Sequence, residues 1–387
     1  MRVSFIDSVS LIDSEQWNAI TGIDYPFTRH EFLLALETSG ATNRETGWQP
    51  QHVTVYQSNA GKEKLIAVMP LYLKYHSYGE FVFDWSWADA YRRHGLDYYP
   101  KLLSAIPFTP ATGPRLCVAA DCDATIVNEA VISAIYQHAE SLGVSSIHIL
   151  FPDQTACEAF QLEGLAARHG AQFHWFNQGF TDFDDFLATF SSRKRKNLRK
   201  ERMAVADQNL TLEVFEGHEI SSDIWQRFYY FYQMTYAKRS GHGGYLDQEF
   251  FELIGKTIPE NLVLVLAYDN NKGGQAIAGA LNFRDSKTLY GRYWGCIREF
   301  EFLHFEACYY QGIEYCIANH LQRFDPGAQG EHKIQRGFTP VRTYSNHWIA
   351  HPDFRLAVDD FLLRDNAATA DYIEQATTLL PFKKADQ

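Results

Sequence analysis

The spacing of apolar residues along the first half of the chain alternates between the periods of a strand and of a helix. Alternating or continuous apolar runs predict strands at Arg2–Ile6, His52–Gln57, Leu65–Tyr75, Ser145–Leu150 and Phe173–Phe176. Helical spacing predicts helices at Ser14–Ile20, Phe27–Ser39, Thr125–Leu142 and Leu162–Gly170. Asp13 or Ser14 can cap the first of these helices, because its side-chain oxygen can accept a hydrogen bond from the first turn.

The second half shows the same alternation in a similar order. The pattern predicts strands at Leu210–Phe215, Leu262–Tyr268, Ala276–Arg284 and Thr288–Trp294, and a further extended segment from Arg323. It predicts helices at Asp223–Lys238, Gln248–Thr257 and His304–His320. Each half thus contains a strand, a helix, a set of strands and a second long helix, which favours two copies of one α/β unit.

A charged segment interrupts the apolar pattern near residues 180–205 and marks the expected domain boundary. We expect an N-terminal domain at 1–187, a basic connecting helix at 188–205 and a C-terminal domain at 206–387. A chain of 387 residues is long enough for two separate cores.

Composition narrows the class of protein. The net charge of −12 argues against a DNA-binding protein and against a protein whose whole surface binds anionic membranes. The first residues lack the apolar core of a signal peptide, and no run of about 18 apolar residues occurs, so we expect no membrane span and a cytoplasmic location. The six cysteines form no CxxC pair, so free thiols are expected rather than a disulfide framework or a zinc ribbon.

The segment Arg193–Arg202 carries seven cations and one anion in ten residues. Ser191 or Ser192 can cap a helix here, on which Arg195 and Arg199 share one face. Like charges at this spacing repel, so the segment is either a solvated helix or a phosphate site for a nucleotide, a coenzyme, a tRNA or a precursor. The candidate phosphate-binding residues are Arg193, Arg195, Lys196 and Arg199.

Polar and ionisable groups are densest between Tyr290 and Trp348. They include Arg292, His304, Glu306, Tyr309, Gln329, Glu331, His332, Lys333, Arg336, Tyr344 and His347. Gly327, Gly330 and Gly337 punctuate this stretch and can adopt a positive φ or allow close backbone approach. Such a mixture in an otherwise apolar α/β domain indicates a cleft rather than a core.

Glu306 and Tyr309 lie three residues apart on the helix predicted to begin at His304, so they share one helical face. A glutamate in a partly desolvated cleft can act as the base that deprotonates an amine. The predicted catalytic residues are Glu306, Tyr309 and His304. The predicted substrate-binding residues are Arg292, Gln329, Glu331, His332, Lys333, Arg336 and His347. The alternatives are a structural hydrogen-bond network around buried tyrosines, and a surface pair formed by Glu331 and His332.

Several common catalytic patterns do not occur in the sequence. There is no GxGxxG, no GxxxxGK[ST] and no GxSxG, which disfavours a dinucleotide site, a P-loop and a serine hydrolase. The histidines lack a tight ligand spacing, so no metal is expected.

Three segments of the second half carry a family resemblance: GAQGEHKIQRGFTPVRTYSNHW (Gly327–Trp348), HFEACYYQGIEYCI (His304–Ile317) and GHGGYLDQEFF (Gly241–Phe251). They resemble the Fem-like branch of the GNAT acyltransferases, a bacterial family linked to peptidoglycan biosynthesis. Fem-like proteins place a basic helix between two domains and carry a Lys-x-x-x-Gly-Phe pattern, which Lys333 and Gly337-Phe338 match. The resemblance implies an α/β fold of two tandem GNAT-like domains, with mixed sheets flanked by helices, and amide-bond formation from an activated acyl donor.

The acyl donor stays open at this point. GNAT enzymes grip the coenzyme pyrophosphate with a [Gln/Arg]-x-x-Gly-x-[Gly/Ala] loop after a strand, whereas the nearest match, Lys238–Gly243, follows a predicted helix. Acyl-CoA is therefore a weakly supported cofactor, beside aminoacyl-tRNA or no donor. We expect an N-acyltransferase acting on an amine of a small molecule or a muropeptide-like cell-wall precursor. The alternative is a catalytically inactive GNAT-fold protein that binds an anionic metabolite or such a precursor.

Overall fold

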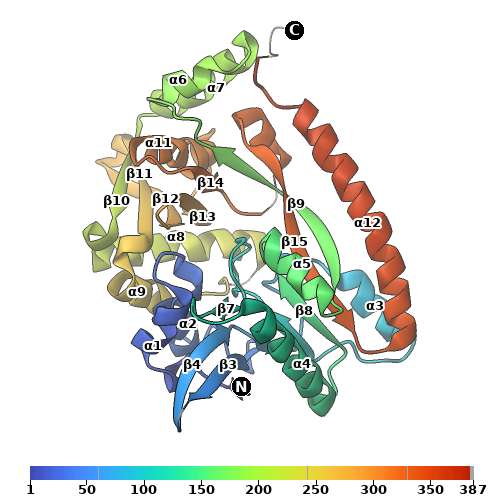
Figure 1. Ribbon diagram of the computed structural model, residues 1–387. Helices are drawn as coiled ribbons and strands as arrows, with labels where there is room; N and C mark the ends of the chain where they lie inside the picture. The colour runs from blue at the N-terminus through green and yellow to red at the C-terminus, as the bar shows by residue number, and fades with distance from the viewer. Residues whose placement is uncertain (60, 242, 329, 384–387) are drawn as a thin grey trace. The chain divides into compact units, whose positions relative to one another are not determined.

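The computed structural model describes residues 1–59, 61–241, 243–328 and 330–383 (Figure 1). The chain forms two compact units, Met1–Ala171 with Arg342–Tyr372, and Gln172–Val341 with Ile373–Gln387. The expected division at 1–187, 188–205 and 206–387 was consecutive, whereas these units are interleaved along the chain. The reason is a strand pairing, because Ser345–Ile349 pair with Ser146–Leu150 and bring this late segment into the first unit.

The first unit contains two sheets. Its strands are β1 (Arg2–Ile6), β2 (Trp48–Pro50), β3 (His52–Asn59), β4 (Lys62–Met69), β5 (Tyr72–Lys74), β6 (Lys101–Ser104), β7 (Cys117–Val118) and β8 (Ser146–Leu150). Its helices are α1 (Ser14–Thr21), α2 (His30–Thr38), α3 (Trp85–Arg93), α4 (Ala124–Leu142) and α5 (Gln154–Leu162), with 3₁₀ turns at Val9–Leu11 and Pro26–Thr28. β1-β3-β4-β7 form an antiparallel sheet, and β8-β6-β5-β2 pair in that order, with β6 and β8 parallel.

The boundaries between the units fall inside three elements, β9 (Ala166–Phe176), β15 (Thr339–Ile349) and α12 (Pro352–Thr378).

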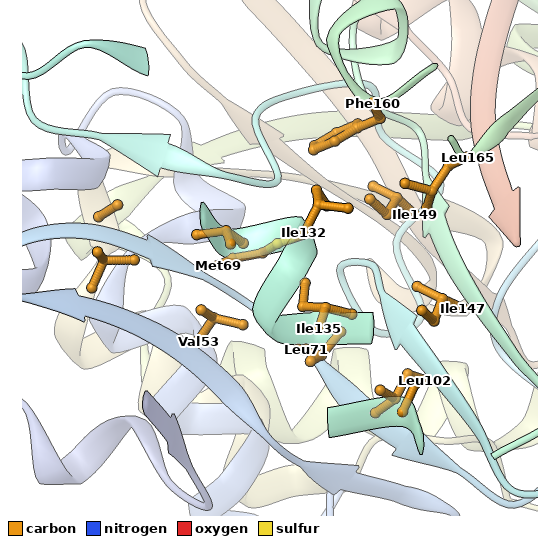
Figure 2. Close-up of a cluster of buried hydrophobic side chains, with 14 of the residues drawn as sticks. Val53, Met69, Leu71, Leu102, Ile132, Ile135, Ile147, Ile149, Phe160 and Leu165 are labelled. Carbon is orange, nitrogen blue, oxygen red and sulfur yellow. The ribbon is translucent and has the colours of Figure 1, made fainter. Parts of the chain in front are cut away.

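The core of the first unit lies between α4 and strands of both of its sheets. Ile132 and Ile135 of α4 point among strand residues that are at most 1% exposed (Figure 2). These strand residues include Val53, Met69, Leu102, Ile147 and Ile149. Asp123 caps α4 by accepting hydrogen bonds from the backbone N–H groups of Thr125 and Ile126, and Gly143 ends it in the left-handed conformation.

The second unit is built on a mixed sheet. Its strands are β10 (Leu210–Glu216), β11 (Leu262–Asp269), β12 (Gln275–Arg284), β13 (Thr288–Cys296) and β14 (Arg323–Asp325), which pair in that order and then with β9. Its helices are α6 (Phe183–Ala188), α7 (Ser192–Asp207), α8 (Ser222–Ser240), α9 (Gln248–Thr257), α10 (Leu303–Phe305), the π-helical turn η6 (Glu306–Tyr310) and α11 (Gln311–Ala318). 3₁₀ turns occur at Gly217–Glu219, Pro259–Asn261, Asn270–Lys272 and η7 (Glu331–Arg336).

Two irregularities in this sheet matter for the site. β13 and β14 are parallel and pair over only three residues, ending at Tyr290 and Asp325. On its other edge β13 pairs with β12, where the register shifts so that Arg292 has no opposite residue, as in a β-bulge. Helix α8 crosses β13 very closely, because a Cβ at Gly295 would lie 2.2 Å from the carbonyl carbon of Phe231.

Most of the predicted elements are confirmed, including Thr125–Leu142 as α4, Gln248–Thr257 as α9 and the three strands between Leu262 and Trp294. The basic segment is helical, with Ser191 as its N-cap residue. The α/β class with mixed sheets flanked by helices is confirmed (Figure 1). The six cysteines all lie among the described residues, and none of them is in a disulfide bond. Among the described residues, no helix has the length and apolarity needed to span a bilayer.

Three predicted elements are wrong in type or extent. The helix expected at Leu162–Gly170 is the end of α5 followed by β9, because Gly164 adopts a φ of 90° and the chain then joins the sheet. Pro70 separates β4 from β5 within the single strand expected at Leu65–Tyr75. The helix expected at Phe27–Ser39 begins only at His30, after a 3₁₀ turn. The long helix α12 and the pairing of β15 were not predicted.

Helix α4 offers a matched pair of isoleucines to test the core. Ile135 is 1% exposed and Ile126 is 54% exposed on the same helix. We expect Ile135→Ala to lower the free energy of unfolding by about 2–5 kcal/mol, since it removes buried methyl groups and leaves a cavity. Ile126→Ala should change it by less than about 0.5 kcal/mol. Denaturant titration measures both values, and equal losses would contradict the assigned burial.

Candidate functional site

A cavity of about 510 Å³ opens in the second unit and contains much of the predicted chemistry. We call it the polar cavity. Five predicted site residues line it: Arg292, His304, Tyr309, His332 and Lys333. The other lining residues are Thr235, Tyr236, Ala280, Leu281, Asn282, Gly291, Tyr293, Trp294, Cys308, Pro326, Ala328 and Gly330.

The polar cavity exists where β13 and β14 stop pairing. Beyond Tyr290 the chain of β13 continues to Cys296, while β14 ends at Asp325 and passes into the loop before η7. The positive φ angles that were expected to be possible at the three glycines around this loop are confirmed, at 89° for Gly327, 104° for Gly330 and 86° for Gly337. Such angles favour glycine, so the sequence pattern of this loop follows from its path around the cavity.

A buried carboxylate positions the two cations of the cavity. Asp325 accepts hydrogen bonds from Arg292 Nη2 at 2.8 Å and from the N–H of Gly327 at 2.9 Å. Lys333 Nζ donates to the carbonyl of Gly327 at 2.7 Å. Arg292 and Lys333 are therefore both held through the turn at Asp325–Gly327. Burial opposes ionisation of Asp325, but the Arg292 guanidinium outweighs it and lowers the pKa of Asp325 well below its ordinary value.

Lys333 is an unusual lysine, since only 2% of it is exposed. Burial lowers the pKa of Lys333 to about 8, although Asp325 partly offsets this effect. The group thus remains mostly charged at neutral pH while being close to its titration range. A fixed cation of this kind can bind an anionic group or stabilise negative charge that develops in a reaction.

A tyrosine–histidine pair also lines the cavity. Tyr309 Oη and His332 Nε2 are hydrogen bonded at 2.9 Å. Partial burial, followed by the charges of Arg336 and Lys333, lowers the pKa of His332, which favours the neutral imidazole. The ring of His304 packs edge-on against both Tyr309 and Trp294. A neutral imidazole bonded to a phenol is suited to accept a proton from a substrate through the phenol.

Glu306 and Arg336 bind helix α7 through ion pairs. Glu306 is 4% exposed and forms a two-point ion pair with Arg202, at 2.8 and 3.1 Å. Arg336 pairs with Glu201 at 2.9 Å, and its guanidinium packs over the ring of Phe305. Neither residue is among those that line the cavity. The structure therefore favours a structural role for both, in place of the catalytic and substrate-binding roles expected from the sequence.

Of the remaining predicted substrate-binding residues, Glu331 and His347 are not among those that line the cavity. Glu331 is exposed on η7, and Gln329 lies outside the described residues. His347 belongs to the first unit, where it is 3% exposed and its Nδ1 lies 2.7 Å from Nδ1 of His148. The expectation that all polar groups between residues 290 and 350 converge on one hollow thus holds for only part of that stretch.

The predicted phosphate-binding residues lie on α7. Arg193, Lys196 and Arg199 are exposed, Arg195 is half-buried, and Arg199 pairs with Asp184 at 2.7 Å. This arrangement fits a solvated helix face as well as a phosphate site, and their phosphate-binding role stays a prediction.

Sequence reasoning missed several residues that line the cavity, and also Asp325, which holds Arg292 there. Asp325 directly follows the extended segment predicted from Arg323 and precedes Pro326-Gly327, which is a recognisable strand-to-turn signal. Thr235 and Tyr236 come from α8, whose periodicity gave no sign of which face meets β13. Asn282 is 2% exposed within strand β12. A polar residue inside an apolar strand pattern indicates a site, and this signal was available in the sequence.

Two cofactor expectations can be compared with the geometry. The sequence Lys238–Gly243 begins inside the last turn of helix α8 (Ser222–Ser240), so no strand precedes it as one precedes a pyrophosphate loop. The segment between β13 and α10 contains Glu299 and Glu301 and no glycine, which does not suit a diphosphate either. Within the described part of the chain, no cluster of three or more His, Cys, Asp and Glu could hold a metal ion.

Comparison with known proteins places the chain in a family. A family model described as FemAB-like, for peptidoglycan biosynthesis and recognition, matches residues 8–384. Among solved structures, FemX matches with a TM-score of 0.53 and 13% identity, covering 93% of this chain and 100% of FemX. L-PGS from Bacillus licheniformis matches with a TM-score of 0.50 and 11% identity, covering 86% and 96%. A tandem GNAT protein from the clavulanic acid biosynthesis pathway matches with a TM-score of 0.46 and 9% identity, covering 91% and 99%.

No curated protein matches the chain significantly. The similarities to FemX and L-PGS show a shared fold, and the family model confirms the Fem-like resemblance of the sequence.

The lowered pKa of Lys333 predicts how the stability of the protein changes with pH. The unfolded chain keeps this lysine charged up to about pH 10, whereas the folded protein releases the proton from about pH 8. Between these values the unfolded state binds more protons, so the contribution of Lys333 to stability rises with pH. We expect the free energy of unfolding to gain about 1–3 kcal/mol more between pH 7.5 and pH 10 in the wild type than in Lys333→Met.

Denaturant titrations at the two pH values measure this difference, and the exposed Lys256→Met is the control. A parallel pH response of the wild type and Lys333→Met would show that Lys333 does not titrate in this range.

Proposed function

Since the chain belongs to the FemAB-like family of peptidoglycan biosynthesis and recognition, we propose that it transfers an acyl or aminoacyl group to an amine in the polar cavity. The acceptor is a small molecule or a cell-wall precursor, and the reaction takes place in the cytoplasm. One observation carries the proposal: the Tyr309–His332 pair and the buried Lys333 line one cavity at the opening between two parallel strands.

The tyrosine–histidine pair supplies the proton transfer. The amine nitrogen attacks the acyl carbonyl, a C–N bond forms and the C–O or C–S bond to the carrier breaks. Tyr309 Oη takes the proton from the nitrogen as it passes its own proton to His332 Nε2. The imidazolium then returns the proton to the leaving oxygen or sulfur, so the residues end as they began. Tyr309 replaces Glu306 as the group nearest to the amine, because Glu306 is bound to Arg202.

The edge of β13 supplies the oxyanion contact. Beyond Tyr290 the pairing with β14 has ended, so backbone N–H groups of this edge can face the carbonyl of the donor. Lys333 lines the same cavity and its charge faces a backbone carbonyl, so it favours an acceptor or intermediate that carries negative charge, whereas the charge of Arg292 is met by Asp325. An anionic muropeptide-like precursor fits this charge better than a simple cationic amine.

The geometry favours an aminoacyl ester over acyl-CoA as the donor. The strand-to-helix segment that would contact a coenzyme diphosphate carries Glu299 and Glu301, which would repel it, and its one cation, Arg298, is paired with Asp269. An aminoacyl-tRNA presents its ester at the end of a single strand and does not need that contact.

Transfer assays with paired variants test the proposal. The purified protein is incubated with alanyl-tRNA, seryl-tRNA, phenylalanyl-tRNA or acetyl-CoA and with a UDP-linked muropeptide, and the acylated product is measured by mass spectrometry. We expect product from a tRNA donor, and a loss of at least tenfold in kcat for Tyr309→Phe and for His332→Asn, since each breaks the proton path. Glu306→Gln should lower kcat less than either.

Tyr230→Phe, at an exposed tyrosine of α8, is the matched control and should keep full activity. Thermal shift with the muropeptide alone completes the test. A protein that is stabilised by the muropeptide but forms no product with any of the donors would be a binding protein, and the acyltransferase proposal would be overturned.

A further inference from the structure

A second cavity of about 290 Å³ adjoins the polar cavity in the second unit. We call it the aromatic cavity. Three residues line both cavities: Thr235, Trp294 and His304. The residues that line only the aromatic cavity are Lys238, Cys296, Arg298, Glu299, Phe300, Phe302, Leu303 and Phe305. The two cavities therefore adjoin at these residues, and a ligand that reaches from one into the other has to pass them.

The aromatic rings of this cavity are only half-buried. Trp294, Phe300, Phe302 and Phe305 are all partly exposed, although each could pack fully in a core. Each square ångström of apolar surface that stays in water instead of being buried loses about 25 cal/mol of stabilising free energy. A group of half-exposed aromatic side chains around a hollow is the usual composition of a site for an apolar ligand.

One of these residues is held in an unfavourable backbone conformation. Phe302 has a φ of 59°, in the left-handed region that a bulky residue rarely adopts. It directly precedes helix α10, where glycine would be free of this strain. A strained residue persists where the surrounding structure or a function requires it, and here the residue contributes a ring to the cavity wall.

The charges at the rim do not mark an anion site. Arg298 pairs with Asp269 at 2.8 Å and Lys238 Nζ donates to the carbonyl of Ile297 at 2.9 Å. Glu299 lies at the same rim. The two cations are thus already engaged with protein groups, and the selective surface of this cavity is its aromatic lining.

We propose that the aromatic cavity binds the acyl group of the donor, and that this group is a ring or a long apolar chain rather than a small one. This inference rests on the proposed acyl transfer and adds the class of acyl group to it. An engineered apolar cavity of about 150 Å³ holds one benzene molecule, so a volume of 290 Å³ accommodates a phenyl group or a chain of roughly eight carbons. The reacting carbonyl lies at the shared wall, next to His304.

Binding of carrier-free acyl amides tests the inference without any turnover. Octanoyl-N-methylamide, phenylacetyl-N-methylamide and acetyl-N-methylamide are titrated into the full-length protein by calorimetry, with adenosine as a fourth probe. We expect the first two to bind at least tenfold more tightly than the acetyl compound and than adenosine. Tighter binding of adenosine would show that the cavity holds a base of the carrier, and equal binding of all three amides would show that it does not select the acyl group. Either result overturns the inference.

Two variants assign the effect to the cavity. Phe300→Ala should weaken binding of the octanoyl amide at least fivefold. Phe302→Gly removes a ring and also relieves the backbone strain, so it should weaken binding as much while leaving the melting temperature little changed. Phe176→Ala, at a half-exposed phenylalanine of β9, is the matched control and should bind as the wild type does.

The amide titration and the transfer assay fail independently. Selective amide binding without any transfer would overturn the proposed function and leave the cavity as a binding site. Transfer of a small acyl group with the same kcat/KM as a phenylacetyl group on the same carrier would overturn the inference and leave the proposed function intact.

Discussion

The early end of pairing between β13 and β14 is the constraint on which the site depends. Two parallel strands that stay paired would close the sheet and leave no room between them, whereas here they pair over three residues only. The bulge at Arg292 and the turn at Asp325–Gly327 lie at this opening. The carboxylate of Asp325 accepts hydrogen bonds from the Arg292 guanidinium and from the N–H of Gly327, whose carbonyl in turn binds Lys333. A buried charge with several fixed partners is costly to displace, so the positions of Arg292 and Lys333 in the polar cavity are fixed before any ligand binds.

Helix α7 holds the other wall of this site by ion pairs of opposite polarity in adjacent residues. Glu201 binds Arg336 of η7, and Arg202 binds Glu306 of the π-helical turn. The neighbouring residues of these elements, His332 and Tyr309, meet in the cavity. The basic segment therefore has two kinds of residue with separate roles: Glu201 and Arg202 bind the protein, whereas Arg193, Lys196 and Arg199 are exposed.

The strands of the second unit and the region of the site could be predicted from the sequence, but the roles of the site residues could not. Glu306 and Tyr309 were expected on one face because an α-helix brings residues three apart together. The π-helical turn Glu306–Tyr310 is wider, so the same step turns the two side chains apart, and no local pattern announces such a turn. Arg292, Lys333 and Arg336 are equally basic in the sequence, and only their partners Asp325, Gly327 and Glu201 distinguish them. The prediction of secondary structure was wrong where Pro70 and Gly164 end an element within an apolar pattern.

The interleaving of the two units has a consequence for how the chain is made. The residues up to Ala171 leave the ribosome long before β15, yet β8 at the edge of their sheet pairs with that late strand. During synthesis the first unit thus exposes an unpaired strand edge, the kind of surface on which chains associate wrongly. A nascent chain of this topology gains from a chaperone that shields the edge, and it differs in this from proteins whose domains are strung one after another and finish folding in turn.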